Sequence, residues 1–131
     1  MIISVIIENM YQALRTRKTY LRYKKNRENG LYNKGCRLCQ IKPIKKFKYW
    51  NILPNEYPWD FIAKKHDMAV PIRHTTYYAL DKKEKLEYEM KVKTYAEKNY
   101  EMLIEASTKN KSIPGHYHVH LVSLQDKYNR E

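Results

Sequence analysis

The segment from His116 to Val122 reads His-Tyr-His-Val-His-Leu-Val, and it limits the fold more than any other part of the chain. In a β-strand, alternate side chains share a face and lie about 6.6 Å apart. The alternation therefore predicts a strand over residues 116–122 whose three imidazoles line one face. Burial of the opposite face would set the register of this strand. That buried face would hold Tyr117, Val119 and Leu121.

A row of three imidazoles can serve several kinds of chemistry. A neutral imidazole can attack phosphorus, bind a metal or donate a proton, depending on what its second nitrogen contacts. Neighbouring imidazoles disfavour one another's protonation, which keeps a nucleophilic histidine neutral near pH 7. Same-face histidines can also ligate one metal ion, so a three-histidine zinc site is an alternative. A second alternative is a half-exposed strand whose histidines simply face solvent.

The two cysteines, Cys36 and Cys39, form a Cys-x-x-Cys pair. Such a pair is typical of a metal half-site or of a redox motif in a reducing compartment. A structural zinc ion usually takes four ligands, often two cysteines and two histidines. Two reduced thiols without a metal are the alternative, and a thioredoxin-like role is disfavoured because no strand leads into the motif. The histidines that could complete a metal site are His66, His74 and His116.

The remaining periodicity predicts an α+β domain with an antiparallel sheet. Apolar residues at helical spacing indicate an amphipathic helix over residues 3–26, which Asn29-Gly30 ends. Two later segments, residues 47–53 and residues 67–72, have the composition of strands.

The second half of the chain begins with a helix signal. Asp81 and Glu84 resemble a capping box, which opens a helix that we expect to run to about Ala106. A polar loop over residues 109–115 then leads into the histidine row.

Positive charge is concentrated at the start of the chain. Residues 1–50 hold 13 Lys and Arg against 2 Asp and Glu, so nearly all of the net charge of +12 lies there. A local field of this kind attracts the phosphates of nucleotides, nucleic acids or lipid headgroups. A length of 131 residues suits one compact domain. We divide the chain into a basic amphipathic helix and connector over residues 1–35 and a domain over residues 36–131.

The basic N-terminal half predicts a surface that binds RNA or DNA through phosphate contacts and base stacking. A solubilising charged face is the alternative. No stretch approaches the roughly 18 consecutive apolar residues of a membrane helix, and no basic residue precedes the apolar opening. We therefore expect a cytoplasmic protein without a transmembrane segment. The aromatic residues available for stacking are Tyr20, Tyr23, Tyr32, Tyr49 and Trp50.

Three motifs in this order resemble the histidine-triad superfamily of nucleotide hydrolases and transferases. They are the cysteine pair, the segment His66-Asp-Met-Ala-Val-Pro-Ile-Arg-His74 and the histidine row. The resemblance spans about residues 36–122 and implies a five-stranded antiparallel sheet with flanking helices, commonly paired into a homodimer. It also implies a structural zinc ion whose ligands are Cys36, Cys39, His74 and His116.

The resemblance assigns chemistry to the other two histidines of the row. His118 would attack the α-phosphorus of a nucleotide derivative and form a nucleotidyl-histidine intermediate, which water or another acceptor resolves. His120 would bond phosphate oxygens or the leaving atom. The expected activity is that of a nucleotide hydrolase or nucleotidyl transferase. The alternatives are a nucleotide- or nucleic-acid-binding module without turnover and a structural zinc protein without a ligand.

The expected phosphate contacts depart from the family pattern. Many members carry a Gln-Ser pair just before the first triad histidine, whereas this chain has Ser112-Ile113. Ser112 and the backbone N–H groups up to Gly115 are the candidates that would replace the missing serine. Asn55 and Asp60 lie in the region expected to contact base and ribose, and we take Asn55 as the binding candidate.

Overall fold

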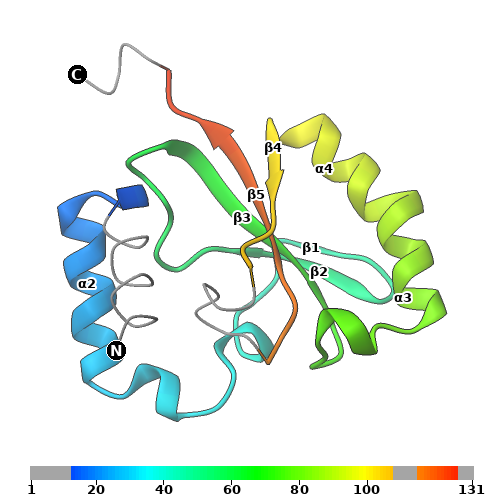
Figure 1. Ribbon diagram of the computed structural model, residues 1–131, viewed down its shortest axis with the longest axis horizontal. Helices are drawn as coiled ribbons and strands as arrows, with labels where there is room; N and C mark the ends of the chain where they lie inside the picture. The colour runs from blue at the N-terminus through cyan, green and yellow to red at the C-terminus, as the bar shows by residue number, and fades with distance from the viewer. Residues whose placement is uncertain (1–12, 108–114, 127–131) are drawn as a thin grey trace.

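The computed structural model describes residues 13–107 and 115–126 and contains a five-stranded antiparallel sheet. The strand order is β1-β2-β3-β5-β4, so β5 lies between β3 and β4 (Figure 1). Each neighbouring pair is antiparallel. The predicted α+β class and five-stranded antiparallel sheet are confirmed. The strands are β1 (Lys45–Lys46), β2 (Trp50–Pro54), β3 (Ala63–Pro71), β4 (Met102–Ile104) and β5 (Val119–Leu124).

The first two predicted strands are found with different bounds. Residues 47–49 belong to the turn of the β1–β2 hairpin, where the Phe47 N–H donates to the Trp50 carbonyl at 2.7 Å. The third strand starts at Ala63, earlier than the predicted segment 67–72. Its added residues include two exposed lysines, Lys64 and Lys65. Because these side chains are polar, a prediction from apolar runs misses this part of the strand.

A continuous helical segment lies along one side of the sheet (Figure 1). It comprises α3 (Lys82–Glu87), the π-helical turn η4 (Tyr88–Val92) and α4 (Lys93–Asn99). The predicted capping box is confirmed, because Asp81 and Glu84 each accept the other's backbone N–H at 2.9 Å. The apolar side of this helix packs into the main core. That core includes Trp50, Ile52, Ala69, Leu80, Val92, Ala96, Val119 and Leu121.

The helix ends at Asn99 and not near Ala106 as predicted. Tyr100 has extended backbone (φ −137°, ψ 156°), and its hydroxyl donates to Asp67 of β3 at 2.5 Å. The chain then pairs with β5 as the edge strand β4. A short apolar run fits a helix or a strand equally well. The long-range contact of Tyr100 decides here that the helix ends and a strand follows.

The opposite face of the sheet carries smaller apolar clusters. Leu38, which comes from the short turn η2 (Arg37–Cys39), packs on Met68 and Val70 of β3. Helix α2 (Arg17–Glu28) lies on the other side of the sheet from α3 and α4 (Figure 1). It packs through aromatic side chains on a loop, in a cluster of Tyr20, Tyr23 and Tyr57.

The predicted helix over residues 3–26 is interrupted where the structure describes it. Thr16 has extended backbone and caps α2. Asp60 stabilises this break by accepting the Thr16 N–H at 2.8 Å and the hydroxyls of Thr16 and Thr19 at 3.0 and 2.5 Å. The helix ends just before Asn29-Gly30, as predicted, with Gly30 at φ 83°. Within the described residues, no helix is long and apolar enough to cross a membrane.

Candidate metal centre and histidine cluster

The histidine row is only partly a strand. Strand β5 begins at Val119, so His116 and His118 precede it, and the predicted start of the strand at residue 116 is wrong. The ladder with β3 ends at the Ala69–Val119 pair. Pro71 has no N–H to donate, and its carbonyl is bonded to the His116 ring. The predicted alternation nevertheless holds, because the intervening residues lie in the main core: Tyr117, Val119 and Leu121.

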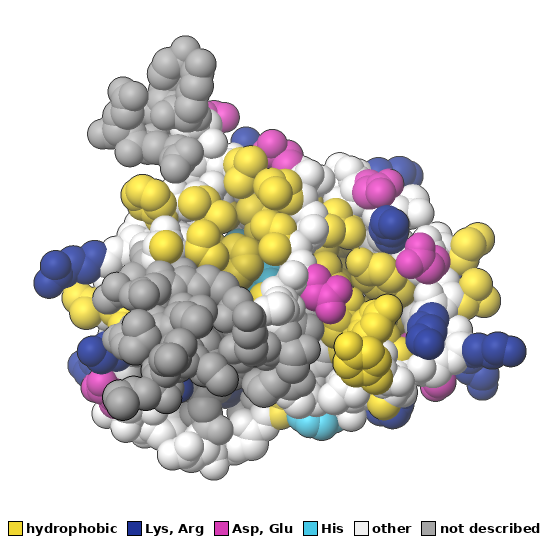
Figure 2. Space-filling model, viewed as in Figure 1, with side chains coloured by type: hydrophobic (Ala, Val, Ile, Leu, Met, Phe, Trp, Pro, Cys, Tyr) yellow, Lys and Arg dark blue, Asp and Glu magenta, His cyan; other side chains and the backbone are white. Residues whose placement is uncertain are grey.

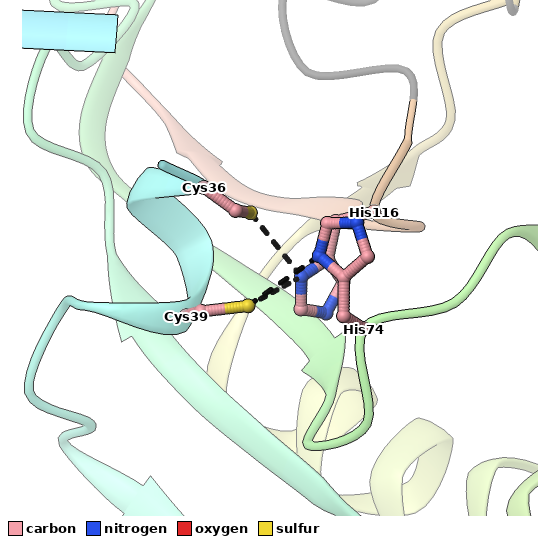
Figure 3. Close-up of side chains that lie close together, drawn as sticks. All are labelled: Cys36, Cys39, His74 and His116. Atoms are coloured by element: carbon pink, nitrogen blue, oxygen red, sulfur yellow. Dashed lines mark hydrogen bonds between the residues drawn. The ribbon is translucent and has the colours of Figure 1, made fainter. Parts of the chain in front are cut away.

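Four side chains that the resemblance assigned to a metal ion lie together (Figure 3). Cys36 caps and Cys39 ends the turn η2, His74 follows β3, and His116 precedes β5. Their ligand atoms all lie within 4.8 Å of one another. The cluster could therefore hold a metal ion such as zinc, which would join three segments that are far apart in the chain.

The separate distances suit a tetrahedral ion. With Zn–S near 2.3 Å and Zn–N near 2.0 Å, a sulfur and a nitrogen ligand lie about 3.5 Å apart. Nδ1 of His116 lies 3.5 Å from Cys36 Sγ and 3.4 Å from Cys39 Sγ. Nδ1 of His74 lies 3.4 Å from Cys39 Sγ. Four protein ligands complete the coordination shell, as in structural rather than catalytic zinc sites.

The surroundings of His116 prepare its Nδ1 for a metal. Its Nε2–H donates to the Pro71 carbonyl at 2.8 Å, so the lone pair is on Nδ1, which faces the thiols. Burial lowers the pKa of His116, the Pro71 carbonyl partly opposes this, and the nearby His74 lowers it again. The neutral imidazole, which is the form that binds metals, is favoured. Burial and the adjacent Cys36 raise the pKa of the Cys39 thiol, so a bound cation would promote its ionisation.

The main chain of His116 also orients His118. Nδ1 of His118 lies 2.9 Å from the His116 carbonyl oxygen. Because a carbonyl can only accept, Nδ1 carries the ring proton and Nε2 carries the lone pair. His118 is buried, at 3% exposure.

His66, a candidate metal ligand from sequence, instead pairs with His120. Nε2 of His66 lies 2.9 Å from Nδ1 of His120, and Nδ1 of His66 accepts the Trp59 N–H at 2.9 Å. The Trp59 indole packs against both imidazoles in tilted arrangements, with centroid distances of 4.6 and 4.2 Å. Sequence reasoning missed this pair because it depends on the register between β3 and β5, which places Met68 opposite His120.

The other residues predicted to contact a ligand lie in different parts of the structure. Ser112 lies outside the described residues. Gly115 is exposed directly before the histidine row. Asn55 brings its amide nitrogen to 3.4 Å from Nε2 of His66, so it lies beside the histidine pair. Asp60 accepts hydrogen bonds from the cap residue Thr16 and from Thr19 at the start of α2, which gives it a structural role.

The aromatic residues of the basic half are mostly buried. Tyr20 and Tyr23 are 7% and 4% exposed, and Trp50 is completely buried. The prediction that these three stack on bases is wrong, because their rings pack in apolar clusters of the protein. Tyr49 is half-buried, and the side chain of Tyr32 is outside the described part.

The positive charge of α2 does lie at the surface. Its exposed cations outnumber its single acidic residue. Over the α3–α4 side, by contrast, basic and acidic side chains are interspersed (Figure 2). The exposed cations of α2 are Arg17, Lys18, Arg22, Lys24, Lys25 and Arg27.

Comparison of the chain with protein-family models, with curated protein sequences and with solved structures found no match in any of the three. The resemblance to histidine-triad proteins stays a prediction from three motifs. The functional interpretation therefore depends on the geometry described above.

Proposed function

We propose that this protein is a nucleotide hydrolase or nucleotidyl transferase in which His118 attacks the α-phosphorus of a nucleotide derivative. The observation that carries the proposal is the 2.9 Å contact between Nδ1 of His118 and the His116 carbonyl. It orients the ring and leaves the lone pair on Nε2. The carbonyl dipole also stabilises the positive charge that the ring acquires when Nε2 bonds phosphorus.

In the proposed reaction, Nε2 of His118 forms a bond to the α-phosphorus while the bond to the leaving group breaks. The leaving group keeps the electron pair, accepts a hydrogen bond from the Nε2–H of His120 as it departs, and takes its proton from solvent water. Water or another acceptor then attacks the same phosphorus and gives up its proton to solvent water. The N–P bond breaks, and its electron pair returns to Nε2 of His118.

The metal centre supports this chemistry indirectly. Zinc, when bound by the four protein ligands, supplies structural rigidity at this site. The ring of His116 would then be held at Nδ1 by the metal and at Nε2 by the Pro71 carbonyl. Because the carbonyl of the same residue orients His118, immobilising His116 also immobilises the nucleophile.

A radiolabelled nucleoside phosphoramidate or dinucleoside polyphosphate tests the proposal. We expect wild type to turn the substrate over and His118→Asn to lose about a hundredfold or more in rate. A covalent nucleotide adduct, trapped under denaturing alkaline conditions, should map to His118 by mass spectrometry. Zinc content and thermal unfolding equal to wild type would show that the variant is folded. Equal turnover by both proteins would contradict the proposal.

Binding of nucleic acid without turnover is a second candidate, which the exposed cations of α2 favour. Affinity that depends on phosphate contacts falls steeply as salt rises. We expect a triple Gln variant of Arg17, Lys18 and Lys24 to bind a short single-stranded RNA more weakly than wild type. The matched control replaces three exposed lysines on the α3–α4 side, and an affinity insensitive to salt would contradict this function. The control positions are Lys82, Lys91 and Lys98.

A further inference from the structure

His66 lies on β3 with both ring nitrogens engaged. Its Nδ1 receives the backbone N–H of Trp59 at 2.9 Å, and its Nε2 lies 2.9 Å from Nδ1 of His120. Both imidazoles are buried, at 5% and 7% exposure, beneath the indole of Trp59. These contacts, rather than hydrogen bonds to bulk water, therefore decide which nitrogen of each ring carries the proton.

The direction of the hydrogen bonds follows from the peptide N–H of Trp59. A backbone N–H can only donate, so Nδ1 of His66 is an acceptor and carries no proton. A neutral imidazole has one N–H, which must then be on Nε2 of His66. This N–H donates to Nδ1 of His120, so the proton of a neutral His120 is on Nε2. The reverse direction would leave His66 without any ring proton.

The neighbouring amide of Asn55 does not change this assignment. Its oxygen accepts the Tyr57 N–H at 2.9 Å, so only its NH₂ group is directed at His66, at 3.4 Å. Nε2 of His66 already carries a proton and cannot accept from this group. The shorter contact, to His120, is the hydrogen bond.

His66 keeps this form over a wide pH range. Burial, followed by the positive charge of Arg15 and by the charge that His118 carries when protonated, lowers the pKa of His66 to about 3. The neutral ring, with one proton to donate, is therefore its form in neutral solution.

We propose that His66 is a positioning residue, which holds His120 in the tautomer with its proton on Nε2. It does so through two consecutive hydrogen bonds, from the Trp59 N–H to His66 and from His66 to His120. The rings of His118 and His120 lie 5.1 Å apart at 83°. In the proposed reaction, the Nε2–H of His120, beside the nucleophile, donates to a phosphate oxygen or leaving atom. This role in the reaction rests on the proposed function, whereas the tautomer itself does not.

Long-range ¹H–¹⁵N correlation spectra of the full-length, zinc-loaded protein with ¹⁵N-labelled histidine test the assignment directly. We expect Nε2 of both His66 and His120 to show the shift of a protonated nitrogen and Nδ1 of both to show that of an acceptor. The resonances are assigned with variants in which one histidine at a time is replaced. Protonated Nδ1 on either residue overturns the proposal, whatever the activity.

Two variants of His66 separate positioning from packing. In His66→Leu the donor is lost, so the His120 nitrogens should move towards the averaged shifts of two exchanging tautomers, and kcat should fall about tenfold or more. In His66→Gln an amide N–H can still reach His120, so the wild-type tautomer and part of the rate should return. Unchanged His120 shifts in the Leu variant overturn the proposal. Wild type with the expected tautomer but without turnover would refute the proposed function and leave the positioning role of His66 supported.

Discussion

At the scale of single residues, each imidazole of the histidine row takes its role from the group that its second nitrogen contacts. The Pro71 carbonyl leaves Nδ1 of His116 available as a metal ligand. The carbonyl of His116 leaves the lone pair of His118 on Nε2. His66 does the opposite for His120, because it donates to Nδ1. Three chemically identical side chains are thereby made different by one hydrogen bond each.

Because His66 stays neutral when folded, it should make the protein sensitive to acid. Its pKa is lowered to about 3, whereas the unfolded chain takes up the same proton near pH 6.5. Stability should therefore fall as the pH drops through this window, by about 1.4 kcal/mol per pH unit in its middle. Urea unfolding of wild type and His66→Gln between about pH 4 and 6, with a chelator present in both, measures the difference. Equal pH dependence in the two proteins would contradict the buried neutral state.

At the scale of secondary-structure elements, the Tyr100–Asp67 hydrogen bond joins the end of α4 to β3. Burial and the bond to Asp67 raise the pKa of Tyr100, so the hydroxyl stays protonated and donates. We expect Tyr100→Phe to destabilise the protein by about 1–3 kcal/mol, because it leaves the buried Asp67 carboxylate without this donor. Urea unfolding measures the loss. Tyr78→Phe is the matched control, since Tyr78 is 88% exposed and should change stability little.

The start of α2 depends in the same way on Asp60. Burial opposes its ionisation, but hydrogen bonds from Thr19 and Thr16 lower the pKa of Asp60 below its ordinary value. Its contribution is present above the unfolded carboxyl pKa, near 3.9, and is lost as the pH falls through the lower folded pKa. Asp60→Asn should cost about 1 kcal/mol near neutral pH, because it weakens the hydrogen bonds from Thr16 and Thr19. Asp126→Asn, at an exposed position, makes the same charge change, and an equal effect of both would contradict the role of Asp60 at the start of α2.

At the scale of the whole molecule, the four candidate metal ligands bring the N-terminal region next to the loops that flank β3 and β5. Cys36 caps η2 and Cys39 ends it, and the two histidines come from the loops after β3 and before β5 (Figure 3). A ligand that binds only the folded state stabilises it by about 2.7 kcal/mol when it is present at a hundred times its Kd. A metal ion at this position would therefore couple the stability of three segments.

Removal of the metal should accordingly loosen these segments together. We expect a zinc chelator to lower the melting temperature and to speed amide hydrogen exchange in η2 and near His74 and His116. The variant Cys39→Ser should bind less zinc per chain, and the chelator should hardly change its melting temperature. Zinc analysis, thermal unfolding and hydrogen exchange measure the three effects. A wild-type melting temperature unaffected by the chelator, at full zinc removal, would contradict this coupling.

The features that could be predicted from residue order are short-range ones. The alternation in the histidine row, the Cys-x-x-Cys pair, the Asp81–Glu84 capping box and the α+β class all depend on residues within a few positions of one another. Periodicity and side-chain chemistry decide such features locally, so they survive in the folded protein. Joining the two cysteines to His74 and His116 needed a resemblance to known proteins as well.

Long-range contacts decided the remaining features. The strand of the histidine row starts late because Pro71, 45 residues away from His116, ends the ladder. The last helix stops early because Tyr100 bonds to Asp67. His66 meets His120 only through the pairing of β3 with β5. These contacts depend on strand register and on partners distant in the chain, and a local pattern contains neither.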